Sequence, residues 1–124
     1  MNEYEPQLNT PKEIDPLFLK RLQDMGGPKL ASELINMYLV RGPQLVETIG
    51  KGIDTEDYEP AQNAAHSLIS SAGNLGGKRV SDLSKSIELA LHKKEFAEIP
   101  SLHSDLVSAQ ETFQQYLIEA LESL

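Results

Sequence analysis

Residues 61–75, AQNAAHSLISSAGNL, carry the pattern that decides the fold. On a helical wheel with about 100° per residue, the apolar side chains of this stretch gather on one face. That face holds Ala61, Ala64, Ala65, Leu68, Ala72 and Leu75. His66 falls at about 160° from Leu68, among small and polar residues. The stretch therefore predicts an amphipathic helix that buries an alanine and leucine face and exposes a histidine.

The chain on both sides of this stretch has the same helical period. Apolar residues recur at spacings of three and four, and no stretch alternates with the period of two that a half-buried strand requires. These spacings predict helices over about residues 15–24, 28–52, 78–93 and 97–122, and another that starts near residues 54–57 and runs to about residue 73. In the last helix the apolar steps alternate between three and four, which is typical of a helix packed at a shallow angle on its neighbours.

Residues that start and stop helices place the boundaries. Asp15 and Pro16 suit the start of the first helix, because proline there gives up an amide that has no helical partner. Gly26–Gly27 ends that helix. Within the second helix we expect a kink or a break at Gly42–Pro43, because proline removes one backbone hydrogen bond and clashes with the preceding turn.

These elements predict one all-α domain over residues 13–124. Four amphipathic helices with short connections make an antiparallel four-helix bundle, and the short additional N-terminal helix lies on it as a lid. Residues 1–12 are polar and without periodicity, which predicts a flexible N-terminal arm. The length of 124 residues suits a single domain.

The composition excludes several classes of function. The chain has no cysteine, which rules out disulfides, thiolate zinc sites and cysteine nucleophiles. Its net charge of −8 argues against nucleic acid as the main partner, because phosphate binding needs a basic face. No apolar run approaches the ~20 residues of a membrane span, and the polar N-terminus lacks the apolar core of a signal peptide. We expect a cytoplasmic protein that binds neither nucleic acid nor membrane.

The negative charge is unevenly distributed. Residues 95–124 hold six acidic residues and no basic one, whereas the stretch 62–77 around His66 has no formally charged side chain. This distribution predicts a locally neutral face around His66, which an acidic partner approaches without like-charge repulsion. For Lys78 and Arg79, which begin the next helix, we favour simple solvation over contact with a partner.

The wheel alone leaves two interpretations of His66 open. An exposed histidine on a polar face is by default part of the solvated surface. Alternatively, imidazole is a nucleophile near neutral pH, and small neighbours leave room for the active site of another protein to reach it.

Three other candidate sites find no support. The glycine-rich segment 72–79 lacks the Ser or Thr of a phosphate-binding loop and follows a helix rather than a strand. The other histidines, His92 and His103, have no metal-ligand spacing with each other or with His66 and are expected at the surface. The serines after His66 show no base-and-orienter arrangement, so no hydrolase is indicated.

The stretch 64–76, AAHSLISSAGNLG, resembles the phosphoacceptor motif of histidine-containing phosphotransfer (HPt) domains. The resemblance covers about residues 13–122. Asp15–Pro16 is similar to the start of the opening helix of the family, Leu34–Tyr38 to its second helix, and the segment 75–88 to its fourth. The combination of A-H-x-L with A-G-N-L-G in an all-helical chain of this length is specific.

The resemblance implies a phosphorelay intermediate. Such a domain accepts a phosphoryl group on its histidine, here His66, from a receiver-domain aspartate or a histidine kinase, and passes it to the aspartate of a response-regulator receiver. It has no catalytic machinery or cofactor of its own, because the receiver supplies the acidic pocket and Mg²⁺. The family suggests Nε2 as the phosphorylated nitrogen, and a self-contained bundle is compatible with a monomer. The residues expected to dock the partner around His66 are Gln62, Asn63, Ile69, Ser70 and Gly73.

Two positions depart from the family pattern. The family commonly has Lys three residues and Gly four residues after the histidine, where this chain has Ile69 and Ser70. Ile69 offers no charge, and it is either a docking contact or a border residue that packs on the bundle. We interpret both changes as altering rate or partner choice. The alternatives are an HPt-like binding module that docks receivers without transfer, as inhibitor or scaffold, and a helical adaptor unrelated to phosphorelays.

Overall fold

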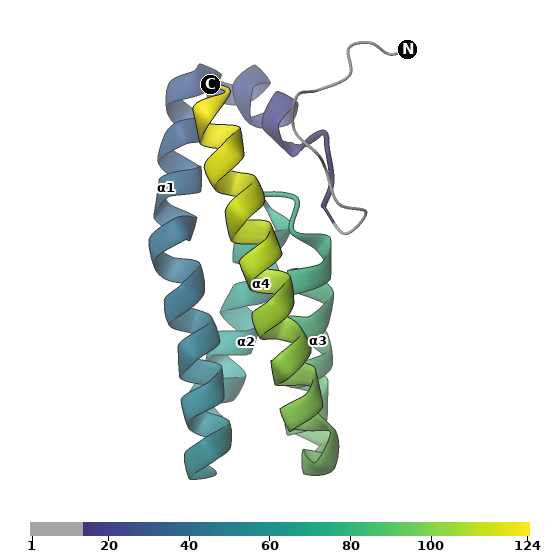
Figure 1. Cartoon of the computed structure of the whole chain (residues 1–124). Helices are drawn as coiled ribbons and strands as arrows, with labels where there is room; N and C mark the ends of the chain where they lie inside the picture. Colours follow the sequence, from purple (N-terminus) through teal and green to yellow (C-terminus); the bar gives the residue numbers. More distant parts are fainter. Residues whose placement is uncertain (1–13) are drawn as a thin grey trace.

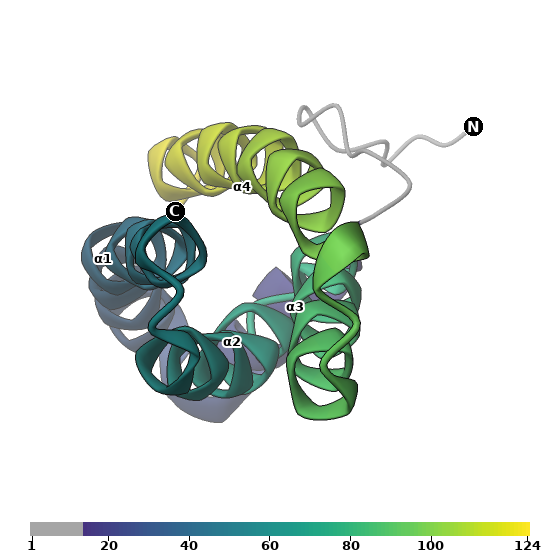
Figure 2. The ribbon, with the colours of Figure 1, turned by 90° about the horizontal axis from the view of Figure 1, so that it is seen from below.

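Four α-helices and one 3-10 turn make up the part of the chain that the computed structural model describes, residues 14–124 (Figure 1). They are α1 (Phe18–Thr55), α2 (Tyr58–Gly73), α3 (Lys78–Lys93), η1 (Phe96–Glu98) and α4 (Ile99–Glu122). Each helix packs on the next, and α4 returns to α1, so that the four surround one core (Figure 2). The predicted all-α antiparallel bundle is confirmed. The predicted arm over residues 1–12 lies outside the described residues.

The short N-terminal helix is the first part of α1. The backbone leaves helical geometry at Gly26 (φ −155°) and Gly27 (φ +77°), where the sequence predicts the end of the first helix. Only glycine adopts such a positive φ at little cost, so this pair redirects the chain. The segment before it lies at one end of the bundle (Figure 1), where Phe18 is buried with its ring 5.8 Å from that of Tyr116.

Of the kink or break predicted at Gly42–Pro43, the break does not occur. Between residues 18 and 55 only Gly26 and Gly27 have non-helical backbone angles, so α1 runs through Pro43. Gly42 serves a packing purpose, because a Cβ atom there would lie 2.6 Å from the Tyr38 ring. Helix α1 also continues past its predicted end at residue 52, and a Cβ on Gly52 would lie 2.7 Å from that of Ala61 in α2. These glycines let side chains and helices approach closely.

The start of α1 lies slightly later than predicted. The helix begins at Phe18 rather than near residue 15, and the Leu17 amide donates a hydrogen bond to the Asp15 carboxylate at 2.9 Å. Asp15 thus stabilises the turn that leads into the helix. The predicted bounds of α3 and the predicted end of α2 agree with the structure, whereas α2 starts at Tyr58, just after the predicted start near residues 54–57.

The core is formed by the faces that the periodicity predicts. All six residues of the predicted α2 face are buried, and so are most of the alternating positions of α4. One polar pair crosses the core, where the Tyr38 hydroxyl donates to Gln110 Oε1 at 2.6 Å. Among residues 14–124, no helix has the length and apolar character needed to span a bilayer.

Candidate functional site

His66 lies in the middle of α2 with its side chain 75% exposed. The opposite face of the helix is anchored, since Ala65 and Leu68 are fully buried. The backbone of His66 is therefore held by the core while its ring faces solvent. This placement agrees with the helical wheel.

A carboxylate from α3 contacts the ring of His66. Nδ1 of His66 lies 2.8 Å from Oε2 of Glu88, whose side chain is 29% exposed. A carboxylate only accepts hydrogen bonds, so this partner assigns the ring proton to Nδ1. In the neutral ring, Nε2 then carries the free lone pair. The geometry leaves one defined nucleophilic nitrogen on the exposed side chain.

Glu88 corrects the predicted neutral face. The stretch 62–77 has no formal charge of its own, but α3 brings a carboxylate into direct contact with His66. Sequence reasoning missed this contact because it joins residues 22 positions apart. The sequence offered one signal: Glu88 follows the apolar Ile87 and so lies at the border of the apolar face of α3. The structure shows that Ile87 is buried. Glu88 reaches His66 only because of the register in which α3 packs along α2.

A second hydrogen bond ties the same two helices together. Ser81 Oγ donates to the backbone oxygen of Ile69 at 2.9 Å, one turn along α2 from His66. The α2–α3 contact on this side therefore has polar links at both His66 and Ile69.

The five predicted docking residues lie along α2 around His66. Asn63, Ser70 and Gly73 are exposed, whereas Gln62 and Ile69 are half-buried. Half-burial of Ile69 leaves part of its side chain accessible and part packed, which fits a border position. Lys78 and Arg79 are exposed, as expected for solvated side chains.

An apolar hollow lies on the other side of α2, toward α1. It is about 690 Å³ in volume and is lined by Leu22, Met25, Leu34, Met37, Tyr38, Arg41, Ser71, Asn74 and Leu75. Met25 and Met37 are 72% and 66% exposed. Flexible methionines on a surface suit contact with a partner protein. The sequence analysis did not single out this patch.

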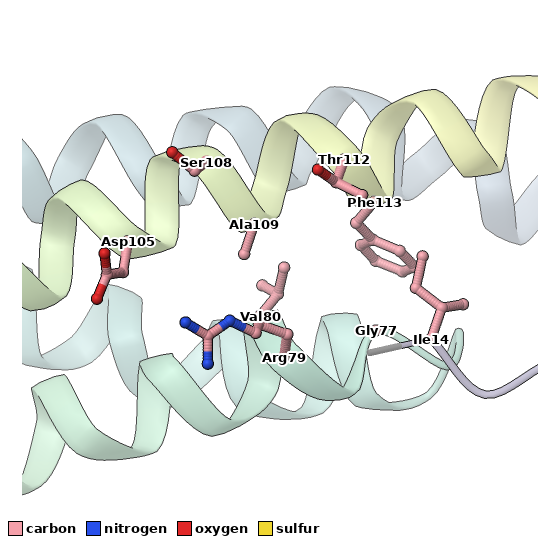
Figure 3. Close-up of a pocket in the computed structure, with 9 residues that line it drawn as sticks. All are labelled: Ile14, Gly77, Arg79, Val80, Asp105, Ser108, Ala109, Thr112 and Phe113. Atoms are coloured by element: carbon pink, nitrogen blue, oxygen red, sulfur yellow. The ribbon is translucent and has the colours of Figure 1, made fainter. Parts of the chain in front are cut away.

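A smaller cavity of about 200 Å³ lies between α3 and α4, as Figure 3 shows. Ile14 and Phe113 line one end, and Arg79 and Asp105 line the other. None of the predicted site residues lies in it.

The remaining histidines do not form a site with His66. His92 is exposed, but His103 is half-buried against α1, with Nε2 3.3 Å from the backbone oxygen of Val46. The expectation of a surface position is therefore wrong for His103, which packs over Gly50. Within residues 14–124, no group of three or more His, Asp or Glu side chains is arranged to hold a metal ion.

Three comparisons relate this chain to known proteins. The family model described as Hpt domain matches residues 33–124. Histidine-containing phosphotransfer protein 2 of Arabidopsis thaliana is 28% identical over 81 residues, which cover 63% of this chain. The match spans about half (52%) of that relative's length. The crystal structure of histidine-containing phosphotransfer protein B (HptB) from Pseudomonas aeruginosa PAO1 superposes with a TM-score of 0.86.

The structural match covers 93% of this chain and 99% of the HptB chain at 14% sequence identity, which establishes a common fold. The family match includes α2 to α4 and most of α1. The chain belongs to the Hpt domain family.

Proposed function

We propose that this protein is a phosphorelay intermediate that carries a phosphoryl group on Nε2 of His66. It accepts the group from a receiver-domain aspartate or a histidine kinase and passes it to the aspartate of a response-regulator receiver, acting as a monomer in the cytoplasm. The observation that carries the proposal is the exposed imidazole whose Nδ1 is bound by Glu88 at 2.8 Å, which leaves Nε2 free to react. Membership of the Hpt domain family supports it.

The transfer of the phosphoryl group from an aspartyl phosphate to His66 needs no reagent other than the two proteins. The Nε2 lone pair attacks the phosphorus of an aspartyl phosphate on the partner, and the new P–N bond forms as the P–O bond to the carboxylate breaks. The bonding electrons leave with the carboxylate, which restores the aspartate. The ring keeps its proton on Nδ1 and becomes positively charged. Passage to the next receiver is the same reaction in reverse.

Glu88 stabilises the product of this step. The positive charge that appears on the ring is shared with Nδ1–H, which already donates to the Glu88 carboxylate. A hydrogen bond with both partners charged is stronger than a neutral one, so the contact gains strength as the group arrives. Glu88 therefore both fixes the reactive nitrogen and compensates the charge that the reaction creates.

The partner supplies what this chain lacks. An acidic pocket with Mg²⁺ in the receiver positions and neutralises the transferred group. Around His66, the small exposed residues Ser70 and Gly73 leave space for that pocket. The exposed methionines Met25 and Met37 extend the contact surface beyond the five docking residues already named.

Transfer from phosphorylated receivers tests the proposal. The chain is incubated with a panel of receiver domains carrying labelled aspartyl phosphate, and acid-labile label on the chain is measured. His92→Gln is the matched control, because it removes an exposed histidine from α3. We expect wild type and His92→Gln to take up label and His66→Gln to take up none. Label that persists in His66→Gln would overturn the site assignment. Binding without transfer would favour the scaffold alternative instead.

A further inference from the structure

One stripe of polar residues on α3 borders the reactive face of α2. Lys78, Ser81, Lys85, Glu88 and His92 follow one another at steps of three and four, so they share one side of the helix. Two of them contact α2 directly: Ser81 binds the Ile69 carbonyl at 2.9 Å and Glu88 binds the His66 ring at 2.8 Å. Lys85 lies between these two contacts.

Lys85 has an ammonium group free to bind an anion. Its side chain is exposed, and within residues 14–124 it takes part in no ion pair. Residues three apart on a helix have Cβ atoms about 5–6 Å apart, so Lys85 begins one turn from Glu88. The flexible four-carbon stem of lysine then spans the remaining gap to a group on the adjacent His66 ring.

Phosphorylation of His66 adds negative charge that a nearby cation stabilises. A protein-bound phosphoryl group carries about −1.5 to −2 charges at neutral pH. Glu88 already contributes a negative charge at this ring, and the segment 62–77 of α2 contributes no cation, since position 69 is isoleucine. Lys78, the other lysine of the stripe, lies near Asp15, whose pKa is lowered chiefly by the hydrogen bond from Arg21 and slightly by the charge of Lys78.

We propose that Lys85 binds the phosphoryl group on His66 and supplies, from α3, the positive charge that position 69 lacks. The inference rests on the proposed function, because it requires a phosphoryl group on that ring. Lys85 then forms a charge-assisted hydrogen bond to a phosphoryl oxygen.

Phosphoramidate, a small phosphoryl donor, tests this without a partner protein. In that reaction Nε2 attacks phosphorus, the P–N bond of the donor breaks and ammonia leaves. The variants are Lys85→Gln, Lys85→Arg and the control Lys93→Gln, which removes the same charge from an exposed site near the end of α3. The rate of phosphohistidine formation is measured at low and high salt, and thermal unfolding verifies that each variant is folded.

We expect Lys85→Gln to react about fivefold more slowly, the effect of one unit charge a few ångströms away in water. Lys85→Arg should stay within about twofold of wild type, and Lys93→Gln should match it. Salt near 1 M should narrow the difference in rate between Lys85→Gln and wild type. At that concentration the Debye length is about 3 Å, so exposed charges farther apart than this are largely screened. Adding Ile69→Lys to Lys85→Gln should restore the rate, since the cation then comes from α2.

Equal rates for Lys85→Gln and Lys93→Gln would overturn the inference. If wild type is still labelled on His66 and His66→Gln is not, that result leaves the proposed function standing. If the folded wild-type chain takes no label from phosphoramidate or from phosphorylated receivers, both the Lys85 inference and the proposed function are contradicted.

Discussion

The Nδ1 atom of His66 donates a hydrogen bond to the Glu88 carboxylate across the α2–α3 contact, at 2.8 Å. This relationship gives a solvent-exposed histidine a defined orientation and tautomer. An isolated surface imidazole would exchange its proton between both nitrogens and rotate freely. The proposed phosphotransfer therefore depends on both α2, which carries His66, and α3, which carries Glu88.

The first prediction concerns Glu88→Gln. The glutamine side chain both donates and accepts, so it no longer fixes the proton on Nδ1, and it cannot neutralise the phosphorylated ring. We expect phosphotransfer from a receiver to slow about tenfold, in line with loss of one hydrogen bond to a charged group at an exposed site. Receiver binding should change little.

Glu95→Gln is the control for this variant, since it removes an exposed acid just after the end of α3. Transfer kinetics with one receiver compare the two. Unchanged kinetics in Glu88→Gln would show that the carboxylate has no part in the reaction.

The second prediction concerns the turn after α2. Gly76 has φ +86°, and a Cβ there would lie 2.9 Å from the Asp15 carbonyl oxygen and 3.0 Å from Phe18 Cβ. Gly76→Ala should lower the free energy of unfolding by about 1–3 kcal/mol, because it adds backbone strain and a clash. Urea denaturation measures the change.

Gly73→Ala provides the comparison, three residues earlier. Its added Cβ would meet Ser81 Oγ at 3.4 Å, an ordinary contact, and the backbone there is helical. Its stability should equal or exceed that of wild type. Equal destabilisation by both substitutions would contradict the role assigned to Gly76.

The third prediction concerns the buried polar pair. Tyr38→Phe removes the donor to Gln110 Oε1 and leaves that oxygen buried, and Gln110 Nε2 already has no hydrogen-bond partner within residues 14–124. An unsatisfied buried acceptor costs about 1–3 kcal/mol, so the free energy of unfolding should fall by that order. Chemical denaturation near neutral pH measures it.

The same tyrosine predicts a dependence on alkaline pH. Burial raises the pKa of the Tyr38 hydroxyl well above its ordinary value of 10.0. Because the raised value belongs to the folded state, its contribution to stability is complete below pH 10 and is lost as pH rises above it. Wild type should therefore lose more stability than Tyr38→Phe between about pH 9 and 11. Parallel loss in both proteins would contradict this.

The periodic features of the sequence were sufficient to predict the bundle and the placement of His66. The buried face of α2 and the bounds of α3 follow from residues close together in the chain, where helical spacing dictates which side chains share a face. The exposure of His66 follows from the same local geometry. These parts of the structure require no knowledge of which helices are neighbours.

Features that depend on helix pairing were not predictable in this way. The Glu88 contact requires the register of α3 on α2, which no local spacing specifies. Gly42–Pro43 was interpreted as a kink or a break, whereas the helix is unbroken there and the missing side chain of Gly42 makes room for the Tyr38 ring. In both cases packing between distant parts of the chain decides the outcome.

The most direct test of the central claim identifies the atom that carries the phosphoryl group. The chain is labelled with ¹⁵N in its histidines, phosphorylated by a receiver or by phosphoramidate, and its ring nitrogens are assigned by NMR. We predict that the phosphoryl group is on Nε2 of His66 and that Nδ1 remains protonated. A phosphoryl group on Nδ1, on another residue, or nowhere on the folded chain would contradict the account.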